Sequence, residues 1–261
     1  MSLTHGTGPF GVRPAGRFNF DAPREGVFYV EELERWVRGR LGGEAVVDSR
    51  HPRLLHEHGT LPVFVFVEDD VRPGLLDPTG GTDTDEVKGE RDLLAVAGSD
   101  GAAWRWLDGE LAGLVGFDWH AMDEWLDEDE PLLGHARDPY SRIDVRQTSR
   151  HVRVSLEGKL LADTRRAKVL YEAGLPPRWY IPEEDVRMEL LEPNDGVQTT
   201  CAYKGHASYW NVGDVENVVW TYRDPEQDAM PVKDMLCFWN ERVDIELDGE
   251  PQERPYSPFS A

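Results

Sequence analysis

The sequence is poor in cysteine and contains no long apolar run. Its 261 residues include only two cysteines, Cys201 and Cys237, which are too few for a disulfide framework or for a zinc site with four thiolate ligands. A membrane-spanning helix needs about 20 mainly apolar residues in succession, and the chain has no such run. The first residues also lack the apolar core of a secretory signal peptide. We therefore expect a soluble, cytoplasmic protein with no membrane span, no bound metal and no other cofactor.

Basic residues are scarce relative to acidic ones. The chain has 28 Lys and Arg residues against 50 Asp and Glu residues, and its formal net charge is −22. Proteins that bind nucleic acids use Lys and Arg to neutralise phosphates, and an excess of carboxylates repels the duplex. The acidic composition therefore excludes nucleic acid as the expected partner.

The main feature that is present is an internal repeat. Residues 37–78 align without a gap with residues 152–193, about one domain length further along the chain. Shared residues include the pairs Glu57/Glu172, Asp70/Asp185, Lys88/Lys204 and Trp104/Trp220. The repeat predicts two domains of one fold, which we expect to pack about a pseudo-two-fold axis like a fused dimer. We divide the chain into an N-terminal arm (1–26), an N-terminal domain (27–135) and a C-terminal domain (136–261).

Most of each copy has the two-residue period of β-strands. Short runs rich in β-branched and aromatic residues, such as 152–156 and 168–172, are separated by Gly and Pro, which mark turns. One segment, 118–130, has a spacing of apolar residues that predicts a helix. The predicted fold class is therefore mainly β, with two tandem domains and little helix.

The two copies differ most in their aromatic residues. Tyr180 and Tyr222 of the second copy correspond to Val65 and Trp106 of the first. A tyrosine can pack against a ligand with its ring and hydrogen-bond to it with its hydroxyl. We therefore interpret the first copy as degenerate and place any working site in the C-terminal domain.

The stretch CAYKGHASYW, residues 201–210, places a thiol close to a lysine. If this segment is a strand, residues three apart point to opposite faces, so Cys201 and Lys204 do not meet and the thiol is a small buried side chain. A lysine placed among Tyr180, Trp220 and Tyr222 would have an aromatic, partly dry surrounding, and Lys204 is then suited to binding an anion or a carbonyl group. A structural ion pair of Lys204 with Glu172 or Asp185 is an equally good interpretation, and the sequence leaves the two open.

An acidic segment offers a weaker possibility. Asp83 and Asp85, in GGTDTDE (80–86), have the spacing of a metal-binding D-x-D motif. The segment is rich in glycine and lies between repeat blocks, so we expect a solvated loop. The sequence contains no phosphate-cradling P-loop and no G-x-S-x-G nucleophile elbow.

The second copy resembles a known family. The segments VRVSLEG (152–158), RWYIP (178–182), CAYKG (201–205) and WTYRDP (220–225) are similar to the pattern of domain of unknown function family 427, in which tandem copies are a known arrangement. The family's motif positions fall on Tyr180, Pro182, Asp185, Cys201, Tyr203, Lys204, Gly205, Trp220 and Tyr222.

The resemblance implies a fold more than an activity. Domains of this family are small, mainly β and similar to the β-tent shape of methionine sulfoxide reductase B and its zinc-binding relatives. This chain lacks the paired C-x-x-C motifs of those relatives, so no structural zinc follows from the resemblance. The family also carries a nucleotidyltransferase label, but that reaction needs carboxylates that hold a metal and a phosphate cradle, and neither is visible in the sequence.

Our hypothesis is that the C-terminal domain binds a small polar or anionic metabolite in an aromatic pocket. Lys204 is the candidate catalytic residue if a reaction occurs, and the sequence leaves open whether the protein is an enzyme. The alternatives are a non-catalytic protein-interaction module built on a fused pseudo-dimer and, more weakly, a nucleotide-handling enzyme. The oligomeric state is also open, and a monomeric pseudo-dimer is compatible with the repeat. The predicted ligand-binding residues are Glu172, Tyr180, Asp185, Cys201, Tyr203, Lys204, Trp220 and Tyr222.

Overall fold

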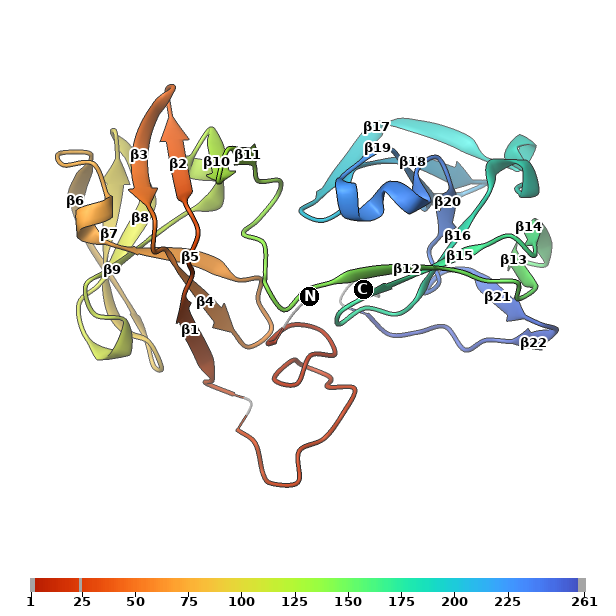
Figure 1. The fold of residues 1–261 in the computed structure, drawn as a ribbon, viewed down its shortest axis with the longest axis horizontal. Helices are drawn as coiled ribbons and strands as arrows, with labels where there is room; N and C mark the ends of the chain where they lie inside the picture. The colour runs from red at the N-terminus through yellow and green to blue at the C-terminus, as the bar shows by residue number, and fades with distance from the viewer. Residues whose placement is uncertain (1–2, 24, 258–261) are drawn as a thin grey trace.

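The computed structural model describes residues 3–23 and 25–257, and it consists mainly of antiparallel strands in two halves that lie side by side (Figure 1). The helices in these ranges are all short 3₁₀ turns. They are η1 (Glu68–Asp70), η2 (Gly109–Leu111), η3 (Trp119–Ala121), η4 (Glu183–Asp185), η5 (Met188–Leu190) and η6 (Gln227–Val232). None of them is long and apolar enough to cross a membrane.

The first half contains two sheets. The seven-stranded sheet has the order β1-β4-β5-β9-β8-β7-β6, and the four-stranded sheet has the order β11-β10-β2-β3. The strands are β1 (Phe28–Glu32), β2 (Val37–Leu41), β3 (Glu44–Ser49), β4 (Arg53–Glu57), β5 (Val63–Val67), β6 (Leu76–Asp85), β7 (Gly89–Val96), β8 (Ser99–Trp106), β9 (Leu114–Phe117), β10 (Glu124–Asp127) and β11 (Glu130–Pro131).

The second half repeats this arrangement. Its seven-stranded sheet has the order β12-β15-β16-β20-β19-β18-β17, and its four-stranded sheet has the order β14-β13-β21-β22. The strands are β12 (Ile143–Gln147), β13 (Val152–Leu156), β14 (Lys159–Thr164), β15 (Lys168–Glu172), β16 (Arg178–Ile181), β17 (Glu192–Cys201), β18 (Gly205–Val212), β19 (Val215–Pro225), β20 (Leu236–Phe238), β21 (Asp244–Leu247) and β22 (Glu250–Pro251). The predicted mainly β fold in two similar copies is confirmed.

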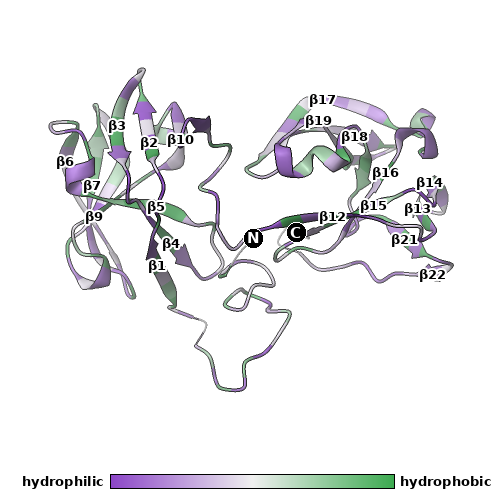
Figure 2. Ribbon diagram, in the orientation of Figure 1, coloured by the Kyte–Doolittle hydropathy of each residue, from purple (hydrophilic) through white to green (hydrophobic). Residues whose placement is uncertain are grey.

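Each half buries a core between its two sheets. In the second half Val154 of β13, Ile181 of β16 and Ile245 of β21 belong to one buried apolar cluster, and the first half has a corresponding cluster that includes Phe66 and Trp125. Figure 2 shows hydrophobic and hydrophilic residues interspersed along the strands, as expected where side chains point alternately to the two faces of a sheet.

The predicted helix at 118–130 is wrong. Only Trp119–Ala121 forms a 3₁₀ turn, and Glu124–Asp127 is strand β10, paired with β2. Trp125 and Leu126 are both buried in this strand. The helical spacing of the apolar residues is therefore overridden by pairing with a neighbouring strand.

The expected solvated loop at 80–86 is also wrong for most of its length. Residues Leu76–Asp85 form the edge strand β6, which pairs with β7. The register shifts between Pro78 and Thr82, and Gly80 has a φ of 79°. The glycine therefore permits a bulge within the strand.

The N-terminal arm contacts both halves. The N–H of Gly59, after β4, donates to the carbonyl of Thr4, and the N–H of Thr7 donates to the carbonyl of Gly174, after β15. Gly59 and Gly174 correspond in the repeat. The arm thus connects equivalent turns of the two copies.

Candidate functional site

Several of the predicted site residues lie on the outer face of the second seven-stranded sheet. Tyr180, Tyr222 and Cys237 belong there to a buried cluster that contains no residue of the four-stranded sheet, with Trp220 packed against it. Ala229 and Val232 of η6 belong to the same cluster. This 3₁₀ turn therefore covers part of the face.

Lys204 does not occupy a strand position. Strand β17 ends at Cys201, and the backbone N–H of Lys204 donates to the Cys201 carbonyl at 3.3 Å, which closes a turn. The Cys201 side chain is close enough to contribute to the raised pKa of Lys204. The premise that Cys201 and Lys204 lie in one continuous strand is therefore wrong, because residues 202–204 form a turn between β17 and β18.

Lys204 forms a buried ion pair with Glu172 of β15. Its Nζ lies 2.5 Å from Oε2 of Glu172, and both residues are 8% exposed. Burial disfavours the charged lysine, but Glu172 and Cys201 outweigh this effect and raise the pKa of Lys204 above its usual value. The structural ion pair left open by the sequence is present.

Two tyrosines lie inside the cluster. The indole Nε1–H of Trp220 donates to the hydroxyl oxygen of Tyr180 at 3.2 Å. Tyr180 and Tyr222 are buried, and this burial raises the pKa of both phenols well above the usual value. Both side chains are therefore neutral at physiological pH.

Two other predicted residues make contacts elsewhere. Asp185, in η4, accepts hydrogen bonds from Arg166 and Thr164, each at 2.6 Å. The hydroxyl of Tyr203 accepts a hydrogen bond from the backbone N–H of Asp138 at 2.8 Å, and Tyr203 lines a cleft of about 630 Å³ between the halves. The predicted set is therefore divided among three places.

The first copy contains the same lysine–glutamate pair. Lys88 Nζ lies 2.5 Å from Glu57 and 3.1 Å from Asp85. Asp85 stands where the second copy has Cys201. A pair that both copies keep is most simply part of the scaffold, since the first copy lacks the polar-tipped aromatics of the second.

The carboxylates of the D-x-D segment are engaged by basic side chains and backbone N–H groups of the protein. Arg91 donates to Asp83 at 2.6 Å and holds the pKa of that carboxyl below its usual value. Asp85 accepts from the backbone N–H groups of Val87 and Lys88. Within residues 3–23 and 25–257, no group of three or more His, Cys, Asp and Glu side chains is placed to hold a metal ion.

The two thiols are expected to differ strongly in reactivity. Cys237 is fully buried, and burial raises its pKa to about 12, so almost none of it is thiolate at pH 8. Cys201 is partly exposed.

We expect 5,5′-dithiobis(2-nitrobenzoate) to label one thiol of the native protein at pH 8, and Cys201→Ala to abolish this labelling. Labelling of Cys237 without unfolding would contradict this part of the structure.

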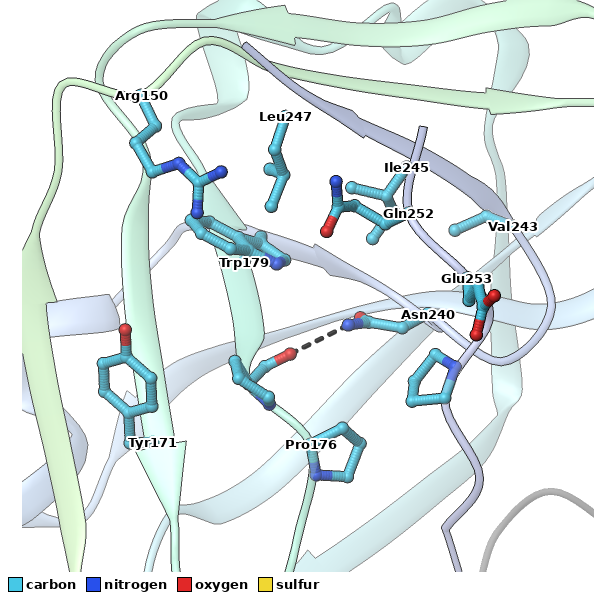
Figure 3. Close-up of a pocket in the computed structure, with 12 residues that line it drawn as sticks. Arg150, Tyr171, Pro176, Trp179, Asn240, Val243, Ile245, Leu247, Gln252 and Glu253 are labelled. Atoms are coloured by element: carbon cyan, nitrogen blue, oxygen red, sulfur yellow. Dashed lines mark hydrogen bonds between the residues drawn. The ribbon is translucent and has the colours of Figure 1, made fainter. Parts of the chain in front are cut away.

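The second half also has a groove that the sequence did not predict (Figure 3). It has a volume of about 270 Å³ and lies between β16, the loop after β20, β21 and the C-terminal segment. Its lining residues include Arg150, Trp179, Asn240, Ile245, Leu247 and Gln252. Trp179 provides an aromatic side of the groove, and Ile245 and Leu247 of β21 provide an aliphatic side. Together with the polar side chains of Arg150, Asn240 and Gln252, they make an apolar slot with a few polar groups.

Asn240 supplies an unpaired acceptor at this groove. Its Nδ2 donates to the carbonyl of Pro177 at 2.8 Å (Figure 3). The residue is 93% buried, since its exposed fraction is 7%, and Oδ1 has no hydrogen-bond partner among the described residues. Turning the amide over would place its oxygen against the Pro177 carbonyl oxygen, so the contact to Pro177 fixes which atom is left unpaired.

A buried ion pair holds the two segments that carry these groups. Arg178 donates to Glu241 through both terminal nitrogens, at 2.6 and 2.8 Å. Arg178 directly follows Pro177, and Glu241 directly follows Asn240. Bidentate pairs of this kind are geometrically specific, so Asn240 is held in place independently of any ligand.

Arg150 places a cation beside the aromatic side of the groove. Its guanidinium carbon lies 5.7 Å from the ring centre of Trp179, and Figure 3 shows the two side chains next to each other. Nε of Arg150 donates to Asp248 at 2.8 Å. Within the described part of the chain its terminal nitrogens have no hydrogen-bond acceptor.

The first half has a tryptophan where the second half has Asn240. The N–H of Asp118 donates to the carbonyl of Ala102, and the N–H of Trp239 donates to the carbonyl of Val218. Both bonds lie one position beyond the last paired residues, which are Ala103 with Phe117 and Val219 with Phe238. The residues that follow Asp118 and Trp239 are Trp119 and Asn240. The repeat therefore places an indole in one copy and a small amide in the other.

A second tryptophan of the first half corresponds to Ile245. Trp125 pairs with Gly39 across β10 and β2, and Ile245 pairs with Val154 across β21 and β13. Gly39 and Val154 correspond in the repeat. In the first half the rings of Trp119 and Trp125 stack with centroids 5.3 Å apart. The groove is thus open in the copy that lacks both indoles.

Sequence reasoning missed the groove residues because they come from separate segments. Arg150, Trp179 and Asn240 lie in different parts of the second copy. Trp179 belongs to the quoted segment RWYIP, but Arg150 and Asn240 lie outside the segments that carry the resemblance. A signal was present in the contrast between Trp119 and Asn240. The second copy has five extra residues between Trp104/Trp220 and Phe117/Phe238, and this insertion hid the correspondence.

Comparison with known proteins assigns the chain to a family. The family model described as a domain of unknown function (DUF427) matches residues 29–128 and again residues 144–249. These two matches coincide with the two pairs of sheets. No curated protein matches the chain. Because the two matches cover most of the sequence, the chain belongs to the DUF427 family, of which it carries two tandem copies.

Proposed function

We propose that the second half binds a small polar ligand in the groove beside Trp179. The observation that carries the proposal is the acceptor Oδ1 of Asn240, which is buried at the groove and unpaired. Buried polar atoms in proteins almost always have a partner. The atom is enclosed by protein, so a ligand in the groove must displace the side chains that cover it before its donor group can satisfy Oδ1.

The size and composition of the groove support this function. Small-molecule sites are concave and mostly apolar, with a few polar groups that fix the orientation of the ligand, and have volumes of roughly 300–1,000 Å³. The groove, at about 270 Å³, is close to the lower limit and suits a small ligand. Trp179 and Leu247 provide apolar surface, and Arg150 provides a positive charge.

The role predicted for Lys204 as charge partner of the ligand stays a separate proposal. Its ammonium group is engaged by Glu172, and Lys204 lines neither the groove beside Trp179 nor the cleft between the halves. Use of Lys204 by a ligand would require this pair to open. Arg150 needs no such rearrangement, so the groove is the better supported location.

The division of the chain at 27–135 and 136–261 also stays a proposal. It is supported by the positions of the sheets, since β11 ends at Pro131 and β12 begins at Ile143. The N-terminal domain then has the same scaffold, with Trp119 and Trp125 at the positions that correspond to Asn240 and Ile245 of the groove.

A thermal-shift screen of the full chain tests the function. The compounds are carboxylic acids, amines, heterocycles, nucleotides and metal salts. A ligand present at 100 times its dissociation constant stabilises a protein by about 2.7 kcal/mol, which raises the Tm of a chain of this size by several degrees. We expect at least one small organic compound to do so.

Matched arginine variants locate the effect. Arg150→Gln should reduce the shift given by an acidic compound, whereas Arg35→Gln, the corresponding change in the first half, should leave it unchanged. Arg35 lines the cleft between the halves, so a shift lost only in Arg35→Gln would place binding in the cleft and contradict the proposal. If no compound class raises the Tm, the protein-interaction module becomes the better hypothesis.

A further inference from the structure

We infer that the ligand of the groove is a flat heterocycle that carries an N–H group and one acidic substituent. This inference rests on the proposed function, because it specifies the chemical class that the same groove accepts. It combines three features of the groove, each with a separate origin in the structure: the unpaired acceptor, the narrow apolar slot and the free guanidinium nitrogens.

The acceptor defines one end of the ligand. Because Nδ2 of Asn240 is held by Pro177, the polar atom of this side chain that has no partner among the described residues is an acceptor and not a donor. It is enclosed, so the ligand's donor group reaches it once the covering side chains move aside. Glu253 also lines the groove, on the side opposite Arg150 (Figure 3), and its carboxylate too can only accept when ionised. This end of the groove therefore selects N–H or O–H groups and disfavours a second acceptor.

The slot defines the shape of the ligand. Trp179 lies on one side, and Ile245 and Leu247 of β21 lie on another (Figure 3). The first half shows what can fill the corresponding space, because it has the indole of Trp119 stacked on the indole of Trp125 at an angle of 20°. A flat ring of about the size of an indole is therefore the expected occupant of the second half. Aromatic rings gain from such offset stacking beyond the area that they bury.

The guanidinium defines the other end. Only Nε of Arg150 is bound to Asp248, and the planar group can offer its terminal nitrogens to a carboxylate. Asp248 and Glu253 carry negative charge near the groove. The local charge balance therefore accommodates one acidic substituent better than two, and places it on the Arg150 side.

The test uses three probes on the full chain, with binding followed by isothermal titration calorimetry. Indole-3-acetate has the ring, the N–H and the carboxylate. 1-Methylindole-3-acetate lacks the N–H, and 3-methylindole lacks the carboxylate. We expect indole-3-acetate to bind, and each of the other two to bind at least about tenfold more weakly, because each leaves a polar group of the groove unpaired. The comparison is made between ligands, so it does not depend on a variant protein that folds.

Variants assign the two contacts. In Asn240→Ala the preference for indole-3-acetate over its 1-methyl derivative should disappear, and in Arg150→Gln the preference over 3-methylindole should disappear. Circular dichroism and the Tm verify that each variant is folded. Equal binding of the methylated and unmethylated acids to the wild type would overturn the inference.

The outcomes separate this inference from the proposed function. If indole-3-acetate does not bind, while another compound from the screen binds in a manner that Arg150→Gln weakens, the ligand class is wrong and the groove remains a binding site. If no organic compound binds at all, both proposals are wrong. Binding that Asn240→Ala and Arg150→Gln leave unchanged would also overturn the inference, since the probe would then occupy another place.

Discussion

Replacement of Lys204 by methionine is expected to lower the free energy of unfolding by about 3–5 kcal/mol, because it leaves the buried carboxylate of Glu172 without its partner. The two groups lie 2.5 Å apart with side chains only 11% and 5% exposed. Removing one member of a buried ion pair lowers the free energy of unfolding far more than replacing both members by apolar residues, because it leaves the other charge buried without a partner. Urea unfolding followed by circular dichroism measures the change, provided that the slope of the transition stays constant.

Two variants serve as controls for this prediction. Lys88→Met in the first half should lower the stability less, by about 1–2 kcal/mol, since the side chain of Glu57 is 28% exposed and water can solvate it. The double variant Lys204→Met/Glu172→Leu should recover much of the loss. A Lys204→Met protein as stable as the wild type, with altered ligand binding, would instead show that the lysine serves the ligand.

Replacement of Asn240 by tryptophan is expected to weaken ligand binding at least about 100-fold while the protein remains folded. The change introduces the side chain that the first half carries as Trp119, and it removes the acceptor Oδ1. A bulky ring in the groove excludes a ligand by overlap, which is a larger effect than the loss of one hydrogen bond. Calorimetry with a compound from the screen measures the loss.

The reciprocal change in the first half is the matched control. Trp119→Asn alters the equivalent position far from the groove and should leave binding to the second half unchanged. Extra volume in a packed site often lowers stability by about 1–3 kcal/mol, so the Tm of Asn240→Trp must be measured beside its affinity. Unchanged affinity in a folded Asn240→Trp protein would mean that the ligand does not occupy the groove.

The repeat in the sequence predicted the main features of the fold for a physical reason. Pairs such as Glu57/Glu172 and Lys88/Lys204 sit at equivalent places in equivalent sheets, and strands show their two-residue period directly in the sequence. The prediction failed for 118–130, where the partner strand, which lies far away in the chain, decided between helix and strand.

The candidate site was less predictable than the fold. The ion pair of Lys204 with Glu172 was one of two interpretations that the sequence left open, and the turn that begins at Cys201 was not visible in the pattern. The opening of the groove depends on the small sizes of two side chains, Asn240 and Ile245. The identity of its unpaired atom depends on the orientation of the Asn240 amide, which the carbonyl of Pro177 sets. Such features follow from three-dimensional packing and not from local spacing.

The central claim is that the second copy keeps an open ligand groove whose counterpart in the first copy is filled by tryptophan. A crystal structure of the full chain, grown with the compound that raises the Tm most, tests it most directly. The account predicts electron density for the compound beside Trp179, with a donor atom at hydrogen-bonding distance from Oδ1 of Asn240, and none beside Trp119 in the first half. Density in the cleft at Tyr203, or against an opened Lys204–Glu172 pair, with the groove empty, would contradict it.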